Sequence, residues 1–93
     1  MRRAFDHLHA ELSVGVGRVV PRYPLWLRLR ELGLDPEHLG REQALGFCRD
    51  HARAFLAEFG LPLPPRAARR LEHAVLRFDP RRPTPSERIA SVR

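Results

Sequence analysis

The residues best suited to chemistry in this chain are arginines clustered in its last third. Residues 61–93 carry eight Arg against three acidic residues, whereas residues 1–60 carry nine Arg against eight. A guanidinium group presents its N–H donors in a planar fork that matches the oxygens of a phosphate. The cationic residues recur at the spacing of one helix face and continue past its expected end: Arg66, Arg69, Arg70, His73, Arg77, Arg81 and Arg82. Such a face could neutralise a nucleic-acid backbone or meet an acidic protein surface.

Composition gives these arginines a second interpretation. The chain has seventeen Arg and neither Lys nor Asn, a bias typical of a GC-rich bacterial genome, so an Arg-rich face can be an ordinary solvated surface. Glu72 and Asp79 partly offset its charge, and Phe78 is its only aromatic neighbour, so platforms for stacking single-stranded bases are missing. Two features argue against sequence-specific DNA binding by a helix-turn-helix. No Asn or Gln lies among these residues to recognise adenine, and the turn before them contains three prolines and does not have the usual geometry of the motif.

Cys48 and His51 form a second candidate site. Their spacing on one helix can place a thiolate beside an imidazole, either to bind a metal or to activate a nucleophile. A structural zinc needs four ligands, however, and Cys48 is the lone cysteine of the chain. His7 and His9 would lie on opposite sides of a helix. Because the pattern puts Cys48 on an apolar helix face, we interpret it as a packing residue and expect neither a metal nor a cofactor.

The common catalytic motifs are absent from the sequence. It contains no P-loop, no nucleophile elbow and no HExxH pair, and the glycines Gly15 and Gly17 are too few for a dinucleotide-binding turn. The acidic residues mostly stand beside arginines, as surface charges do. We therefore expect a protein that is not an enzyme.

Length and composition restrict the fold to one small domain. A chain of 93 residues with a 43% hydrophobic share has the composition of a globular protein with a modest core. A single cysteine excludes an internal disulfide, and no stretch reaches the roughly 18–20 apolar residues that span a bilayer. We expect a cytoplasmic protein without membrane contact. Its helical domain would cover residues 1–79, followed by a Pro/Arg-rich connector and short helix over residues 80–93.

Apolar residues at spacings of three and four predict a first helix over residues 5–19: Phe5, Leu8, Leu12, Val16 and Val19. An alternative ends this helix near Ser13 and makes residues 14–20 an extended segment, which would need a strand from a second chain. We favour the helix, irregular near Gly15. Pro21 ends it in either case.

A second helix is expected over residues 24–32, with Pro24 in its first turn and Gly33 as its left-handed C-terminal residue. Its apolar residues predict burial on more than one side: Leu25, Trp26, Leu27, Leu29 and Leu32. Aromatic and apolar residues beside a rigid proline segment also anchor interfaces, which makes candidates of Tyr23, Trp26 and Leu27. The competing interpretation places Trp26 in the core, and we favour it because a small domain needs large apolar groups.

The remaining helices are delimited by proline and glycine. Asp35 and Pro36 predict a short capped turn. Residues 41–59 give the clearest helix, and Gly60 ends it. Its expected apolar face is Leu45, Cys48, Ala52, Phe55, Leu56 and Phe59. Pro65 starts a helix over residues 65–78 with an inner face of Ala68, Leu71, Val75 and Phe78. A capping box at residues 84–87 starts a short helix over residues 85–92.

Together these segments predict an all-α fold, a small bundle of four to five helices with short connections. No motif identifies a family. We expect a non-enzymatic binding or adaptor protein that acts through protein–protein contacts, including self-association. The alternative is nucleic-acid binding without sequence preference through the arginine-rich face of residues 66–82.

Overall fold

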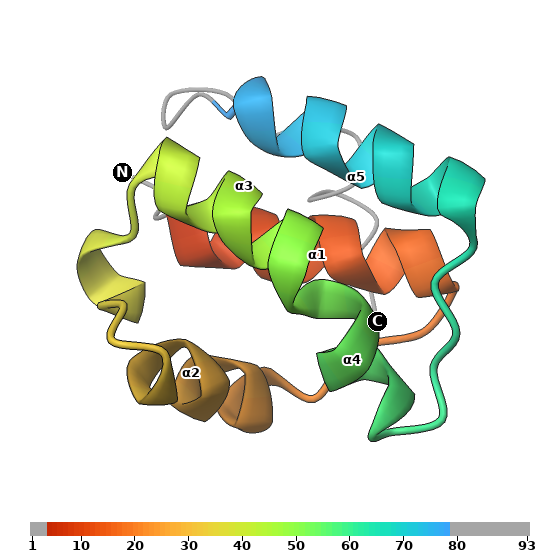
Figure 1. The fold of residues 1–93 in the computed structure, drawn as a ribbon, viewed down its shortest axis with the longest axis horizontal. Helices are drawn as coiled ribbons and strands as arrows, with labels where there is room; N and C mark the ends of the chain where they lie inside the picture. Colours follow the sequence, from red (N-terminus) through yellow and green to blue (C-terminus); the bar gives the residue numbers. More distant parts are fainter. Residues whose placement is uncertain (1–3, 79–93) are drawn as a thin grey trace.

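The computed structural model describes residues 4–78 as five α-helices and one 3-10 turn joined by short connections (Figure 1). The elements are α1 (Ala4–Val16), α2 (Arg22–Glu31), η1 (Pro36–His38), α3 (Arg41–Asp50), α4 (Ala52–Ala57) and α5 (Pro65–Leu76). This part of the chain contains no strand, so the prediction of a small all-α bundle is confirmed. The helix expected over residues 85–92 and the connector before it lie outside the described residues.

Helix α1 runs through the middle of the bundle (Figure 1). It lies between α5 on one side and α2 on the other, and α3 crosses in front of it. Every residue from 7 to 13 is buried, so α1 has no solvent-facing side over these two turns. A helix surrounded in this way must supply partners for its own buried polar side chains.

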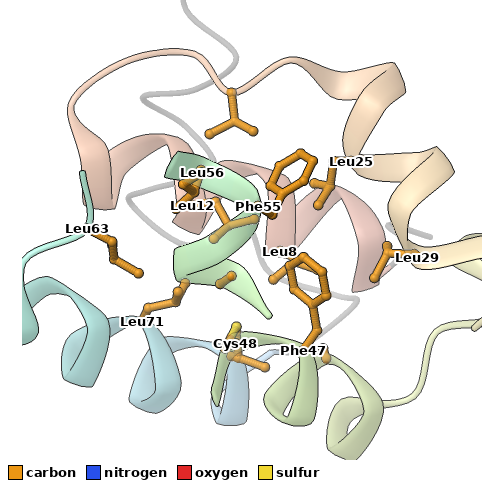
Figure 2. Packing of buried hydrophobic residues seen from close by; sticks show 14 of the residues in the cluster. Leu8, Leu12, Leu25, Leu29, Phe47, Cys48, Phe55, Leu56, Leu63 and Leu71 are labelled. Atoms are coloured by element: carbon orange, nitrogen blue, oxygen red, sulfur yellow. The ribbon is translucent and has the colours of Figure 1, made fainter. Parts of the chain in front are cut away.

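The core fills the space between α1 and the other helices (Figure 2). Leu8 and Leu12 of α1 are completely buried beneath Phe47 of α3 and Phe55 of α4. The Phe47 and Phe55 rings meet edge to face, with their centroids 6.2 Å apart. The other large apolar side chains that close the cluster are Phe5, Val20, Leu25, Leu29, Leu39, Leu56, Leu61, Leu63, Leu71 and Val75.

His9 and Ser13 fasten the α1–α2 connection to α1 through the peptide groups of Val20. His9 Nε2 lies 2.8 Å from the Val20 carbonyl oxygen and donates to it, because a carbonyl can only accept. The Val20 N–H donates to Ser13 Oγ at 3.0 Å, and that hydroxyl donates to the His9 carbonyl at 2.9 Å. All these groups are buried, so the connection is fixed by hydrogen bonds that water cannot replace.

His7 fastens the other side of α1 to α5. Its Nε2 donates at 2.8 Å to the Ala74 carbonyl in the last turn of α5, and the same carbonyl also accepts from the Arg77 N–H at 3.1 Å. The Phe78 ring lies 5.2 Å from the His7 ring and is half-buried. Phe78 therefore packs inward as expected, although α5 ends at Leu76 rather than at residue 78.

Three helices end in the same way, at a glycine with a left-handed backbone. Gly17, Gly33 and Gly60 have φ angles of 73°, 82° and 68°. After each glycine, the next N–H donates back to a carbonyl five residues earlier, the hydrogen bond of a Schellman motif: Arg18 to Ser13, Leu34 to Leu29 and Leu61 to Leu56. The ends at Gly33 and Gly60 were predicted and are confirmed.

The first helix is shorter than predicted. It ends at Val16, because Gly17 adopts the left-handed conformation and turns the chain before residue 19. The alternative boundary near Ser13 is also wrong, since the helix continues for three residues beyond it. Residues 18–21 form a connection that packs through Val20 rather than a strand.

The helix expected over residues 41–59 is divided at His51, whose φ and ψ are −130° and −23°. In a straight helix, residues eight apart lie about 12 Å from one another along the axis. The change of direction between α3 and α4 instead brings Phe55 back onto Phe47 (Figures 1 and 2). The same change leaves Phe59 exposed, contrary to the prediction that it faces inward.

Helix α2 is buried on one side only, which corrects the expectation of wider burial. It begins at Arg22, two residues before the predicted start, and only Leu25 and Leu29 are buried within it. Leu27 and Leu32 are more than one-third exposed. The two buried leucines lie four residues apart and therefore define a narrow contact stripe, which turns the rest of the helix outward.

We expect Gly17→Ala to lower the free energy of unfolding by about 1 kcal/mol, because a Cβ atom disfavours the left-handed conformation. Gly46→Ala is the matched control. Gly46 lies inside α3, and a Cβ atom there would meet open space. The control should raise stability by about 0.5–1 kcal/mol through helix propensity. Urea unfolding measures the free energy of unfolding of both variants. A Gly17→Ala variant as stable as the unmodified protein would contradict the left-handed helix end.

We expect Ser13→Ala to lower the free energy of unfolding by about 1–3 kcal/mol, since it leaves the buried Val20 N–H without an acceptor. Amide hydrogen exchange at Val20 should accelerate in the same variant. Unchanged exchange at Val20 would show that Ser13 does not hold the connection.

Candidate functional site

A groove lies between α1, α2 and η1 and is here called the α2 groove. Its volume is about 390 Å³, within the usual size of a ligand or side-chain pocket. The groove is lined by Phe5, Arg22, Tyr23, Trp26, Pro36 and Glu37. Two of the three interface candidates from the sequence, Tyr23 and Trp26, therefore line one surface.

The packing of α2 places its aromatic side chains at this groove. Because Leu25 and Leu29 face the core, Tyr23 and Trp26 lie on the outer part of the helix. Their rings are nearly parallel, with centroids 6.2 Å apart. Trp26 is half-buried and packs against the core while it also lines the groove, whereas Tyr23 is 67% exposed. Leu27, one helical turn from Tyr23, is 38% exposed.

Arginines cover two of the aromatic rings. The Arg22 guanidinium lies 4.9 Å from the centre of the Phe5 ring and forms an ion pair with Asp6. The Arg30 guanidinium lies 5.1 Å from the centre of the Trp26 ring. These cation–π contacts hold the groove walls in place at a modest energy, on the order of 0.5–1 kcal/mol each at exposed sites.

Sequence reasoning did not identify the other groove residues. Phe5 was assigned only to the core, and Pro36 only to a turn. Both lie beside Tyr23 and Trp26 because η1 packs against α1 and α2. Nothing in the spacing of these residues along the chain indicates that contact.

The second candidate surface is the outward side of α5, here called the α5 arginine face: Arg66, Arg69, Arg70, His73 and Arg77. All five side chains are exposed, because Leu71, Ala74 and Val75 face α1 and α3. Four of the five follow one another at intervals of four, three and four residues, which is a single row along the helix. Arg81 and Arg82, which were expected to extend the row, lie outside the described residues.

The arginines of this face differ from those elsewhere in the protein. Within residues 4–78, Arg66, Arg69, Arg70 and Arg77 have no ion pair or side-chain hydrogen bond. Most other arginines are partnered, through the ion pairs Arg22–Asp6, Arg28–Glu31, Arg28–Glu58 and Arg49–Glu72, and through a hydrogen bond from Arg41 to the Phe78 carbonyl. Arg18, Arg30 and Arg53 are the other exposed arginines that lack such a partner in this part of the chain, although Arg30 lies over the Trp26 ring.

The electrostatic effect of partnering is visible at Glu58. A hydrogen bond of 2.6 Å from Arg28 holds the pKa of the Glu58 carboxyl below its ordinary value. The same arginine also lies over the Phe55 ring, at 5.3 Å from its centre. Arg28 therefore serves as a link between α2 and the end of α4, whereas the arginines on α5 make no comparable link.

Cys48 and His51 are not arranged as a reactive pair. Cys48 is buried in the core, and burial, with the Glu72 carboxylate nearby, raises the pKa of its thiol to about 12. His51 is exposed at the break between α3 and α4, and its ring lies 6.1 Å from the Phe47 ring. Within residues 4–78, no three His, Cys, Asp or Glu side chains come together as metal ligands.

We expect Cys48 in the folded protein to react with a thiol-specific disulfide reagent at least about 100-fold more slowly than in urea, because only an accessible thiolate attacks. The absorbance of the released thiol, followed at pH 8 or nearby, measures both rates. Equal rates in the two states would contradict the buried position of Cys48.

Comparison with protein-family models, with curated proteins and with solved structures yields no match to this chain. In residues 4–78, no helix has the length and apolar character needed to cross a membrane. The two surfaces are therefore interpreted from their own chemistry.

Proposed function

We propose that this protein is a non-enzymatic interaction module that binds a protein partner in the α2 groove, and that its first partner is a second copy of itself. The single observation that carries the proposal is the groove. It places Tyr23 and Trp26, the only tyrosine and tryptophan of the chain, side by side at the surface. Tyrosine and tryptophan are the side chains that most often dominate the energy of protein interfaces.

The exposure of Tyr23 and Leu27 supports this assignment. A small domain gains stability by burying its largest apolar groups, at about 25 cal/mol for each Å² removed from water. Here Tyr23 and Leu27 lie one helical turn apart on the same outward face of α2, and their side chains are 67% and 38% exposed. A partner that covers this face would bury apolar surface that the domain itself leaves in water.

The shape of the surface supports a second copy as the partner. Tyr23 lines the α2 groove and is 67% exposed, so one face combines an exposed ring with a cavity. In a two-fold dimer, the same face of both subunits meets, and each exposed side chain can enter the cavity of the other. A groove of about 390 Å³ is large enough for an aromatic ring.

We expect Tyr23→Ala to weaken dimer formation at least about tenfold, since loss of a central aromatic anchor commonly costs about 2 kcal/mol. Sedimentation velocity over a concentration series measures the dissociation constant. Leu76→Ala is the matched control, because Leu76 is 44% exposed but lies on α5. The control should dimerise like the unmodified protein.

Fluorescence adds an independent readout, because Trp26 is the only tryptophan and lines the groove. Its emission should shift to shorter wavelength over the concentration range in which the dimer forms, since water leaves the ring. An unmodified protein that stays monomeric with constant emission would refute the proposal. Equal weakening by Tyr23→Ala and Leu76→Ala would refute it as well.

A further inference from the structure

We propose that the α5 arginine face binds the sugar–phosphate backbone of a nucleic-acid duplex without reading its sequence. This inference is independent of the α2 groove, because the two surfaces lie on helices on opposite sides of α1 (Figure 1). It concerns a different class of partner and rests on different residues.

The first argument is the uncompensated charge of α5. Arg66, Arg69, Arg70 and Arg77 are exposed and lack carboxylate partners within residues 4–78, whereas Arg22, which is also exposed, pairs with Asp6. Codon bias explains why the cations are arginines, but it does not explain why four unpartnered arginines gather along one side of a single helix. Like charges four residues apart, such as Arg66 and Arg70, cost a helix about 0.2–0.5 kcal/mol. The first turn of α5 also contains no acidic residue to balance the helix dipole.

The second argument is the length and rigidity of the row. From Arg66 to Arg77 the helix rises by roughly 16 Å, at about 1.5 Å per residue. A duplex carries about one phosphate charge per 1.7 Å of its axis, so this length of duplex offers a phosphate to every cation of the face. Helix α5 is held against both α1 and α3 through Leu71 and Val75, which keeps the row straight before a ligand arrives.

The third argument concerns the kind of ligand. Single-strand binding needs exposed aromatic rings for base stacking, and the described part of α5 presents none. A protein interface needs an apolar centre with charges at its rim. On α5 the only large exposed apolar side chain is Leu76, whereas arginines occupy the middle of the face. A duplex backbone requires neither rings nor an apolar centre, so it fits this surface best.

The test is fluorescence anisotropy with a labelled duplex of generic sequence, as DNA and as RNA, over a salt series starting near about 50 mM. The variant Arg66→Gln with Arg70→Gln removes two cations from the N-terminal half of the row. Its matched control is Arg18→Gln with Arg53→Gln, which removes two exposed, unpartnered arginines elsewhere. Both pairs lower the net charge equally, so only position distinguishes them.

We expect the full chain to bind both duplexes, with affinity falling steeply as salt rises. The Arg66/Arg70 variant should reduce the slope of log K against log salt by about two and raise Kd at least about tenfold. The Arg18/Arg53 control and Tyr23→Ala should bind nearly as the unmodified protein does. Circular dichroism confirms that each variant remains folded.

Three results would overturn the proposal. Failure to bind any duplex at low salt would leave the α5 arginine face a solvated surface. Equal losses in the two double variants would show general attraction to a basic protein rather than a defined face. If polyglutamate competed as well as unlabelled duplex at equal charge, the face would be assigned to acidic protein surfaces instead.

Discussion

Helix α1 is buried on every side from residue 7 to residue 13, and this burial governs how its neighbouring helices are placed. A helix in that position must provide partners for its polar side chains, because a buried donor or acceptor left alone costs about 1–3 kcal/mol. Here His7 reaches the last turn of α5, while His9 and Ser13 hold the Val20 peptide before α2. The polar groups of α1 therefore fix the positions of the two helices that carry the candidate binding surfaces.

The two surfaces differ in chemistry because α2 and α5 bury different parts of their side-chain surface against the rest of the protein. Helix α2 gives only a narrow leucine stripe to the core, so its aromatic residues remain at the surface, beside Phe5 and Pro36. Helix α5 gives its whole apolar face to α1 and α3, so its remaining side is charged. One surface is suited to apolar and aromatic contact and the other to anions, and α1 separates them (Figure 1).

Local rules of helix formation explain what the sequence predicted well. Helix ends at Gly33 and Gly60, the capped turn at Asp35 and the start of α5 at Pro65 depend on residues next to each other in the chain, whose backbone preferences act wherever they occur. The same rules apply at Gly17, where α1 ends, but the apolar spacing that continues to Val19 predicts a longer helix. The break at His51 was not predictable in this way, because no glycine or proline stands next to it in the chain and its result is a tertiary contact, that between Phe47 and Phe55.

The helical class, most helix ends and the row of cations on α5 follow from the amino-acid sequence, since each depends on composition or on spacing along one helix. Tertiary structure alone decided which side of α2 is buried and therefore left Tyr23 and Leu27 in solvent. It also decided that Phe5 and Pro36 join Tyr23 and Trp26 in one groove. Within residues 4–78 it brings carboxylates to Arg22 and Arg28 but not to the arginines of α5. These are contacts between residues far apart in the chain, and only the packing of one helix on another creates them.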